Sequence, residues 1–353
     1  MKPLPLRSLP IVDPSAPDAA AGIDAACRAV GFFAVPIGVE LARRRDEMIA
    51  LAAEFFALPP AEKARVSMAV GGTAWRGWFP LGGELTSGVP DGKEGYYFGA
   101  ELPPDPRPLH GPNLWPARPA ALREAVIEWM AAMEALGQRL LGLMGDGLGV
   151  GENYFRAGLT ASLTPLFRIF RYPPQPAGDS ISWGVGEHTD YGLLTLLATD
   201  GTPGLQVNSY GEWIDAPADA DLIICNLGDM LDRLTGGRYR SNPHRVRNHA
   251  GSDRYSLPFF LDPGWHAVVE PIAFADEWDV PLDQQARWDK ANLRDISGAY
   301  GTWLSAKVSK VFPDLASEVA LPLGSATALP LLTAPRTAPS AAHGRVSMPE
   351  SSW

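Results

Sequence analysis

The spacing of apolar positions predicts helices in the first part of the chain. Between residues 122 and 143, apolar side chains recur at alternating steps of four and three: Leu122, Val126, Trp129, Met133, Leu136, Leu140 and Leu143. This spacing puts them on one stripe of a long amphipathic helix, so their expected role is core packing. Earlier helices are expected over 18–30 and roughly 39–56, the second ending before Pro59 and Pro60, with a short strand "GFFAVPI" between them.

After about residue 160 the pattern changes to short apolar runs bounded by Gly, Pro, Asp or Asn. These runs are "LFRIFRYPP", "LLTLLATD", "GLQVNS", "EWIDAPA", "DLIICNLGD", "HRVRNH" and "RYSLPFFLDP". Short strands at this density, with turn signals between them, predict a sandwich or barrel. The Gly-, Pro- and aromatic-rich stretch from 71 to 116 predicts ordered loops with few regular elements. A last helix is expected over 283–312, and the Ala-, Pro- and Ser-rich residues 319–353 are expected to form a tail.

Composition and charge remove several classes of protein from consideration. The chain has 46% hydrophobic residues, enough for a sizeable core, and its net charge of −10 argues against nucleic-acid and anionic-membrane partners. Only Cys27 and Cys225 are present, so neither a disulfide framework nor a thiolate zinc site is expected. The absence of a secretory signal and of an apolar stretch of about 20 residues predicts a cytoplasmic protein without a membrane span. The oligomeric state is left open.

The motif "GEHTDYGLLTLL" contains the first two candidate metal ligands, His188 and Asp190. Residues two apart on a strand point to the same face, so this imidazole and this carboxylate can converge on one point. Among the other histidines, His244 in "YRSNPHRVRN" directly precedes an alternating strand-like segment. Two His and one carboxylate form the facial triad of non-haem Fe(II) oxygenases, which leaves coordination positions open for co-substrate and O₂. A structural zinc site would instead be closed by four protein ligands, usually with thiolates.

A candidate anion clamp follows ten residues after His244. In "RYSLPFF", Arg254 and Ser256 are two residues apart and therefore share one face of a strand. A guanidinium binds a carboxylate in a fixed two-pronged geometry, and a neighbouring hydroxyl adds another donor. An anionic co-substrate could thus bind the metal at one end and this pair at the other. Taken alone, an R-x-S pair would favour an ordinary surface ion pair of Arg254.

Several motifs together resemble the isopenicillin N synthase-like branch of the Fe(II)/2-oxoglutarate-dependent dioxygenases. The likeness covers roughly residues 8–315 and keeps the family's order of motifs. Besides H-T-D, "NPHRV" and R-Y-S, the matching segments are "LPIVD", "GFFAVPIG", "FFALPPAEK", "WRGWFPLGGE", "GPNLWP", "RYPP", "GLQV" and "NLGDMLDRLTGGRYRSNPHRV". Several independent matches in order are much more specific than a single motif.

The resemblance implies an α+β protein with a double-stranded β-helix (jelly roll) core flanked by helices. One catalytic unit is expected over 1–318, with a helix-rich region over 1–160, the jelly roll over 161–275 and the 283–312 helix behind it. His188, Asp190 and His244 match the iron ligands of the family. Arg254 and Ser256 match the pair that binds the C5 carboxylate of 2-oxoglutarate, and Tyr172 a position that often hydrogen-bonds the same co-substrate.

The implied chemistry couples oxidative decarboxylation of 2-oxoglutarate, with Fe(II) and O₂, to hydroxylation, desaturation or cyclisation of a small molecule. Ascorbate is the expected reductant in vitro. The residues expected to contact the primary substrate are Arg168, Phe170, Tyr191 and Phe260. Phe170 replaces an Asn that flavonoid-oxidising plant members often carry, which puts flavonoid-like substrates in doubt. The aromatic loops at 75–98 are expected to form one pocket wall, although Trp75, Trp78, Tyr96 and Tyr97 suit the core equally well.

Arg168 has two possible environments. In "LFRIFRYPP", Arg168 shares a strand face with Phe170 and Tyr172, while Arg171 lies on the other face. If Tyr172 faces the co-substrate, Arg168 points into the barrel and needs an anion or several acceptors, such as a carboxylate or carbonyl of the substrate. If the strand starts later, Arg168 lies at its exposed beginning and pairs with a surface carboxylate.

Two other functions are compatible with the same residues. Isopenicillin N synthase and aminocyclopropane carboxylate oxidase carry an R-x-S pair but dispense with 2-oxoglutarate, so a 2-oxoglutarate-independent oxidase is one alternative. A non-catalytic sensor that binds a metal and an anion is the other. Release of succinate from 2-oxoglutarate with Fe(II), ascorbate and O₂ would separate the three. The identity of the primary substrate does not follow from the sequence.

Overall fold

The computed structural model describes residues 7–174, 183–275, 293 and 296–313. Its α-helices are α1 (Ala19–Ala29), α2 (Val39–Phe56), α3 (Pro60–Lys63), α4 (Met68–Gly71), α5 (Leu122–Gly147), α6 (Tyr154–Ala157), α7 (Asp229–Leu234) and α9 (Tyr300–Val311). Two 3₁₀ turns, η1 (Ala64–Val66) and η2 (Gly72–Ala74), flank α4. Within these residues no helix is both long and apolar enough to cross a membrane.

The strands form a large sheet, a smaller sheet and a short hairpin. The large sheet has the order β1-β11-β8-β13-β6-β5-β2, the smaller one the order β10-β9-β12-β7, and β3 pairs with β4. All strand pairs are antiparallel, and β13 is hydrogen-bonded to β6 on one side and β8 on the other. Their bounds are β1 (Phe32–Pro36), β2 (Gly77–Phe79), β3 (Leu85–Thr86), β4 (Val89–Pro90), β5 (Glu94–Gly99), β6 (Thr164–Tyr172), β7 (Val185–His188), β8 (Leu194–Thr199), β9 (Leu205–Ser209), β10 (Glu212–Asp215), β11 (Leu222–Leu227), β12 (His244–Val246) and β13 (Arg254–Asp262).

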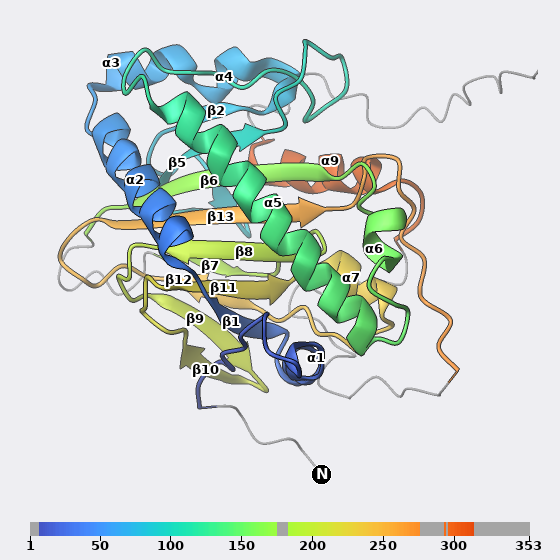
Figure 1. Ribbon diagram of the computed structural model, residues 1–353. Coiled ribbons are helices and arrows are strands. Elements are labelled where there is room, and N and C mark those ends of the chain that lie inside the picture. Colours follow the sequence, from blue (N-terminus) through green and yellow to red (C-terminus); the bar gives the residue numbers. More distant parts are fainter. Residues whose placement is uncertain (1–6, 175–182, 276–292, 294–295, 314–353) are drawn as a thin grey trace, which may run out of the picture. The chain divides into compact units, whose positions relative to one another are not determined.

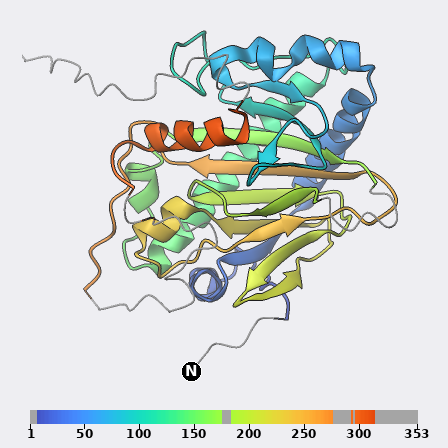
Figure 2. The same cartoon turned by 180° about the vertical axis from the view of Figure 1, so that it is seen from behind.

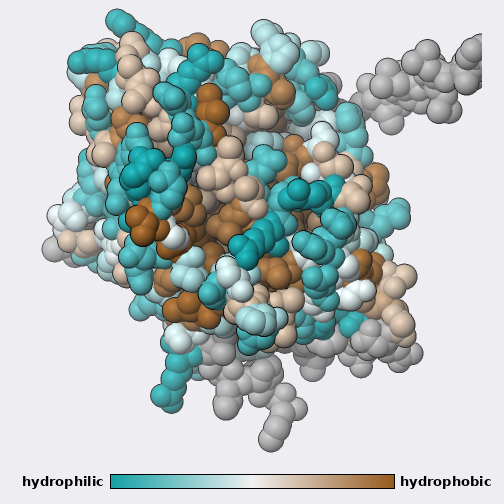
Figure 3. Space-filling view, in the orientation of Figure 1, coloured by the Kyte–Doolittle hydropathy of each residue, from teal (hydrophilic) through white to brown (hydrophobic). Residues whose placement is uncertain are grey.

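The long helix α5 covers the outer face of the large sheet (Figure 1). Its predicted stripe is confirmed, because Leu122, Val126, Trp129, Met133 and Leu140 are buried while Leu136 and Leu143 pack against the core from partly buried positions. Gly137 lets the helix approach β13 closely: a Cβ at this position would lie 2.4 Å from both Cδ atoms of Leu261. On the face shown in Figure 3, hydrophilic side chains cover much of α2 and α5, and apolar ones show between the two helices.

The other face of the large sheet looks toward the smaller sheet. Seen from behind in Figure 2, α9 and the β3–β4 hairpin lie next to each other on the side opposite α5. Residues of β6, β8 and β13 from the large sheet and of β7, β9 and β12 from the smaller one line a common cavity. The predicted fold class, a jelly-roll core flanked by helices, is therefore confirmed, and its two sheets enclose this space.

Two expectations about the elements were wrong. The stretch 71–116 contains β5, a strand of six buried residues that joins the large sheet beside β6, and β2, which pairs with β5. The helix expected over 283–312 is not continuous, because residues 296–299 are not helical and α9 begins at Tyr300. Gly298, with a φ of +84°, and Ala299, which forms a β-bridge with Val268, precede it. Of the expected helix, 283–292, 294 and 295 lie outside the described residues, as does the predicted tail 319–353.

Candidate active site

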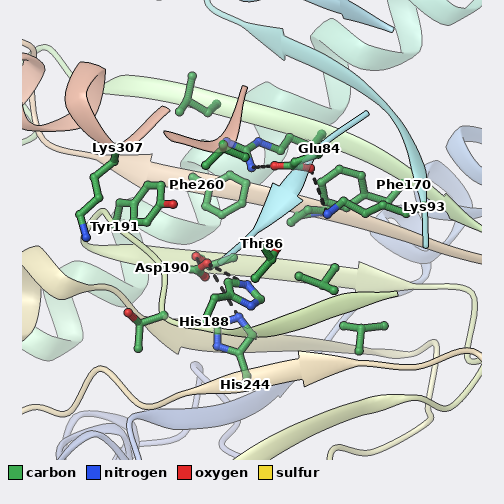
Figure 4. A pocket seen from close by; sticks show the side chains of 18 of the residues that line it. Glu84, Thr86, Lys93, Phe170, His188, Asp190, Tyr191, His244, Phe260 and Lys307 are labelled. Atoms are coloured by element: carbon green, nitrogen blue, oxygen red, sulfur yellow. Dashed lines mark hydrogen bonds and ion pairs between the residues drawn. The ribbon is translucent and has the colours of Figure 1, made fainter. Parts of the chain in front are cut away.

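The three predicted metal ligands meet at one end of the smaller sheet. His188 ends β7 and His244 begins β12, and the antiparallel register places these residues directly opposite each other, with ring centroids 4.2 Å apart. Asp190 Oδ1 lies 3.9 Å from His188 Nε2 and 3.8 Å from His244 Nε2 (Figure 4). Among the described residues, this is the cluster of three ligand atoms that could hold a metal ion.

Asp190 reaches this point by a different route from the one expected. β7 ends at His188, so Asp190 is not the next same-face residue of a strand. The turn that follows is held by the backbone N–H of Asp229, which donates to the Asp190 carbonyl at 2.8 Å, and by the pairing of β8 beyond it. The two-residue spacing was therefore a correct sign of convergence, although the local geometry behind it was wrong.

Hydrogen bonds leave one atom of each ligand free for a metal. The Nδ1 atom of His188 lies 2.8 Å from the Gly186 carbonyl, and that of His244 lies 3.4 Å from the Asn242 carbonyl, so Nε2 faces the cluster in both. The Oδ2 atom of Asp190 accepts bonds from Thr195 Oγ1 at 2.5 Å and Asn226 Nδ2 at 2.6 Å. Its Oδ1 atom thus remains for the metal, as expected when outer partners orient ligands.

The charge states also suit a divalent cation. Burial lowers the pKa of both imidazoles, that of His244 to about 4, so both rings are neutral and can ligate through Nε2. Burial alone raises the pKa of Asp190, but the neighbouring imidazoles and the two hydrogen bonds outweigh this effect and lower it overall. Two neutral imidazoles and one carboxylate, without a nearby thiolate, form a donor set that fits Fe(II).

The predicted anion clamp lies on the large sheet, across the same cavity. Arg254 and Tyr172 are register partners on β13 and β6, and Ser256 Oγ donates to the Tyr172 hydroxyl at 3.4 Å. The Arg254 side chain is 99% buried. Its Nε donates to the Thr202 carbonyl at 3.2 Å, whereas its buried Nη1 has no hydrogen-bond partner among the described residues. A buried guanidinium nitrogen without a partner fits an anionic co-substrate, because leaving it unpaired costs free energy.

The four expected substrate contacts all line this cavity, whose volume is about 460 Å³. Arg168 lies in the middle of β6, which begins at Thr164, so the second environment considered for it is excluded. Arg171 faces away from the cavity and pairs with Glu94 and Asp253. Phe170, Tyr191 and Phe260 contribute rings to the wall, as Figure 4 shows.

The segment 75–98 does contribute to the cavity wall, but through polar residues instead of the expected aromatic ones. Glu84, Thr86 and Lys93 line the cavity, whereas Trp75, Trp78 and Tyr96 are buried in the core. Sequence reasoning also missed Asn226 and Thr195, which hold Asp190. The sequence held only weak signals for these residues. Asn226 is a polar residue inside an otherwise apolar strand, and Lys93, which lines the wall, directly precedes a run of buried strand residues.

Comparison with known proteins places these features in one family. Residues 163–263 match the family model of the 2OG-Fe(II) oxygenase superfamily. Residues 4–118 match a second model, described as "non-haem dioxygenase in morphine synthesis N-terminal". A probable iron/ascorbate oxidoreductase of Dictyostelium discoideum is 39% identical over 328 residues, covering 84% of this chain and 90% of the relative. The 2-oxoglutarate-dependent dioxygenase caaD of Aspergillus niger is 36% identical over 260 residues, covering 71% and 78%.

Another relative is the 1-aminocyclopropane-1-carboxylate oxidase of Dictyostelium mucoroides, which is 32% identical over 357 residues, 88% of this chain and 96% of that protein. Solved structures agree. A full-length Neurospora crassa protein in complex with alpha-KG and 5-formyluracil is 25% identical, with a TM-score of 0.70 over 86% of this chain and 96% of that one. A 2OG-Fe(II) oxygenase family protein of Caulobacter crescentus is 26% identical, also with a TM-score of 0.70, over 86% and 99%.

The predicted resemblance is thus confirmed, and the alternative of a non-catalytic sensor has no support. The chain belongs to the 2OG-Fe(II) oxygenase superfamily, as an Fe(II)- and 2-oxoglutarate-dependent dioxygenase that oxidises a small-molecule substrate.

Proposed function

We propose that His188, Asp190 and His244 hold the iron and that Arg254, Ser256 and Tyr172 bind the far carboxylate of 2-oxoglutarate. The observation that supports this most directly is the pairing of two incomplete sites across one cavity. On the smaller sheet, three ligand atoms converge with their outer hydrogen bonds already made. On the large sheet, a buried guanidinium nitrogen is left without a partner among the described residues.

When bound, iron with 2-oxoglutarate and O₂ supplies the oxidising chemistry that yields succinate, CO₂ and an oxidised substrate. The chain's own contribution is to position the reactants and to keep water away. Thr195 and Asn226 fix the orientation of the Asp190 carboxylate, and Arg254 fixes one end of the co-substrate. Rings of Phe170, Tyr191 and Phe260 give the remaining space an apolar wall for the substrate.

We further propose that the enzyme acts in the cytoplasm. Both cysteines are free and buried, and burial raises the pKa of each thiol well above its usual value. Reduced, protonated thiols of this kind suit a reducing compartment, where structural disulfides are rare. Fractionation of the source cells, with an antibody against the chain, tests this assignment; recovery from a secreted or periplasmic fraction would contradict it.

The function is tested by succinate release from 2-oxoglutarate with Fe(II), ascorbate and O₂. Slow release without a substrate is expected, and Arg254→Ala should abolish it at low 2-oxoglutarate concentration. The control is Arg171→Ala, because Arg171 lies on the opposite face of β6. Oxygen consumption that depends on ascorbate but not on 2-oxoglutarate would contradict the proposal. It would instead point to a reaction of the type named for the 1-aminocyclopropane-1-carboxylate oxidase relative.

A further inference from the structure

Arg168 is the side chain on the cavity wall whose environment the iron and co-substrate do not explain. Its guanidinium carbon lies 4.1 Å from the ring centroid of Tyr97 and 4.7 Å from that of Phe260. Only 17% of its side chain is exposed. Two rings thus contact the guanidinium, and such contacts leave its N–H groups able to form hydrogen bonds at the edge of its plane.

The nearest carboxylate does not use these donors. Glu84 Oε1 lies 3.7 Å from Arg168 Nη1, beyond hydrogen-bond distance, and the Arg168 guanidinium makes no hydrogen bond within the described part of the chain. Glu84 is already engaged: Tyr97 donates to its Oε1 at 2.5 Å, and Lys93 lies 3.0 Å from its Oε2. If Arg168 served only to pair with Glu84, the two groups would be expected to lie within hydrogen-bond distance of each other.

Lys93, in contrast to Arg168, has its charge matched. It is buried, pairs with Glu84 and donates to Asp91 Oδ2, which also accepts a bond from Thr86. Figure 4 shows Lys93 turned toward Glu84. Two carboxylates thus face one ammonium group, which matches the Lys93 charge, while Glu84 Oε2 has no hydrogen-bond partner among the described residues. A ligand in the cavity would therefore meet an Arg168 guanidinium whose donors make no hydrogen bond with the described residues.

The charge of the rest of the wall is favourable to an anion. α9 adds two cations to the cavity lining, Lys307 and Lys310. The Lys307 ammonium lies over the rings of Tyr191 and Trp303, at 5.3 and 5.2 Å from their centroids. Outside the iron and co-substrate sites, the lining carries Lys93, Arg168, Lys307 and Lys310 against Glu84 and Asp262, and Asp91 behind the wall pairs with Lys93.

Apolar side chains form the rest of the wall near Arg168. Leu166 and Phe260 come from the large sheet, and Leu304, Val308 and Phe312 come from α9 and the residue after it. Such a wall binds a hydrocarbon body by burying its surface, while the few polar groups fix its orientation. The cavity therefore combines one open guanidinium with an apolar enclosure.

We propose that the primary substrate is a small monocarboxylic acid with an apolar body, whose carboxylate binds the edge of the Arg168 guanidinium. This inference rests on the proposed function, because the same cavity must hold the iron and 2-oxoglutarate. The body of the acid then lies along the apolar wall, and the contacts with Tyr97 and Phe260 hold the Arg168 guanidinium in place.

The test compares acids with their neutral amides on the anaerobic Fe(II)–2-oxoglutarate holoenzyme. The probes are phenylacetate, cinnamate, hexanoate and octanoate, each paired with its primary amide, and binding is measured by calorimetry. At least one acid should bind roughly tenfold or more tightly than its amide, as expected for a charge-assisted hydrogen bond. Addition of that acid in air should raise succinate release. If no acid exceeds its amide, the proposal is overturned.

Variants then assign the preference to Arg168. Arg168→Met should bring the acid to the affinity of its amide, while Arg171→Met, on the opposite face of the same strand, should keep the full preference. If the Met variant does not fold, Arg168→Lys serves instead, and its preference should fall at least severalfold because the planar fork is lost. An undiminished preference in a folded Arg168 variant overturns the proposal.

The two levels of inference fail separately. Wild-type 2-oxoglutarate binding and succinate release without any acid report on the proposed function alone. If the wild type lacks them, the iron and co-substrate assignment is at fault, whereas their retention together with equal binding of acids and amides rejects only the substrate class.

Discussion

Asn226 donates a 2.6 Å hydrogen bond to Asp190 Oδ2, the carboxylate oxygen that does not face the two histidines. Asn226 lies on β11 of the large sheet and has only 3% of its surface exposed. The carboxylate orientation needed for metal binding is therefore held from the sheet that does not carry the histidines. Outer partners of this kind are worth about 10–100-fold in metal affinity.

We expect Asn226→Ala to weaken Fe(II) binding by about 10–100-fold, because the carboxylate can then rotate away from the histidines. Anaerobic metal titration measures this change. The matched control is Asn208→Ala on β9, whose side chain accepts a hydrogen bond from the Gly211 backbone in a turn. Equal affinity in the Asn226 variant and the wild type would show that the hydrogen bond has no part in metal binding.

Replacing His244 with Ala should abolish turnover and remove most metal binding while the chain stays folded. The reason is that two of three ligands give too little chelation. Turnover and the metal-induced rise in melting temperature measure the effect, and His266→Ala is the control because His266 is exposed and does not line the cavity. Near-normal activity of the His244 variant would exclude it as a ligand.

Arg254→Lys should raise the KM for 2-oxoglutarate roughly tenfold or more, with a smaller effect on kcat. Lysine keeps the charge but lacks the planar two-pronged donor, and one charge-assisted hydrogen bond contributes about 1.5–3 kcal/mol. Initial rates at varied 2-oxoglutarate concentration measure the change, with Arg171→Lys as the control. A KM equal to that of the wild type would mean that Arg254 binds something other than the co-substrate.

Asp262 should make the free energy of unfolding fall as the pH rises. Burial raises the pKa of this carboxyl from 3.8 to about 7, although the hydrogen bond from the Tyr300 hydroxyl opposes the shift. Between these values the folded state holds a proton that the unfolded state has released, so stability declines toward pH 7, by about 1.4 kcal/mol per pH unit from this group. Below pH 4 the stabilisation is fully present.

Asp262→Asn should remove this decline, since an amide has no proton to lose and can still accept from Tyr300. Urea unfolding of metal-free protein at pH 5, 6, 7 and 8 measures the effect in both proteins. The variant should be the more stable of the two at pH 8. Parallel curves for the two proteins would show that the carboxyl titrates normally.

The sequence was sufficient for those features that depend on short-range patterns. The stripe of α5 and the alternation in β6 follow from periodicity, and both are as predicted. His188 and His244 could be recognised because each stands beside a strand whose pattern is visible, and the register of β7 with β12 then brings them together.

Features that depend on long-range pairing were missed. β5 was hidden among Gly and Pro residues, and its strand conformation comes from pairing with β6, about 70 residues later. The contact of Glu84 with Lys93 and Arg168 follows from that pairing, so no local pattern announced it. The start of α9 at Tyr300 depends on the bridge between Ala299 and Val268, which the helical composition of the segment could not reveal.

The proposed iron ligands and the proposed co-substrate clamp stand on different sheets. His188 and His244 belong to the smaller sheet, and Arg254 and Ser256 to the large one. The distance that a bound 2-oxo acid must span is therefore set by the spacing between two packed sheets, which side-chain packing keeps nearly constant at about 10 Å. The spacing of the two sheets therefore selects the chain length of the co-substrate. A 2-oxo diacid one methylene shorter or longer cannot reach both the iron ligands and the Arg254–Ser256 pair in the same geometry.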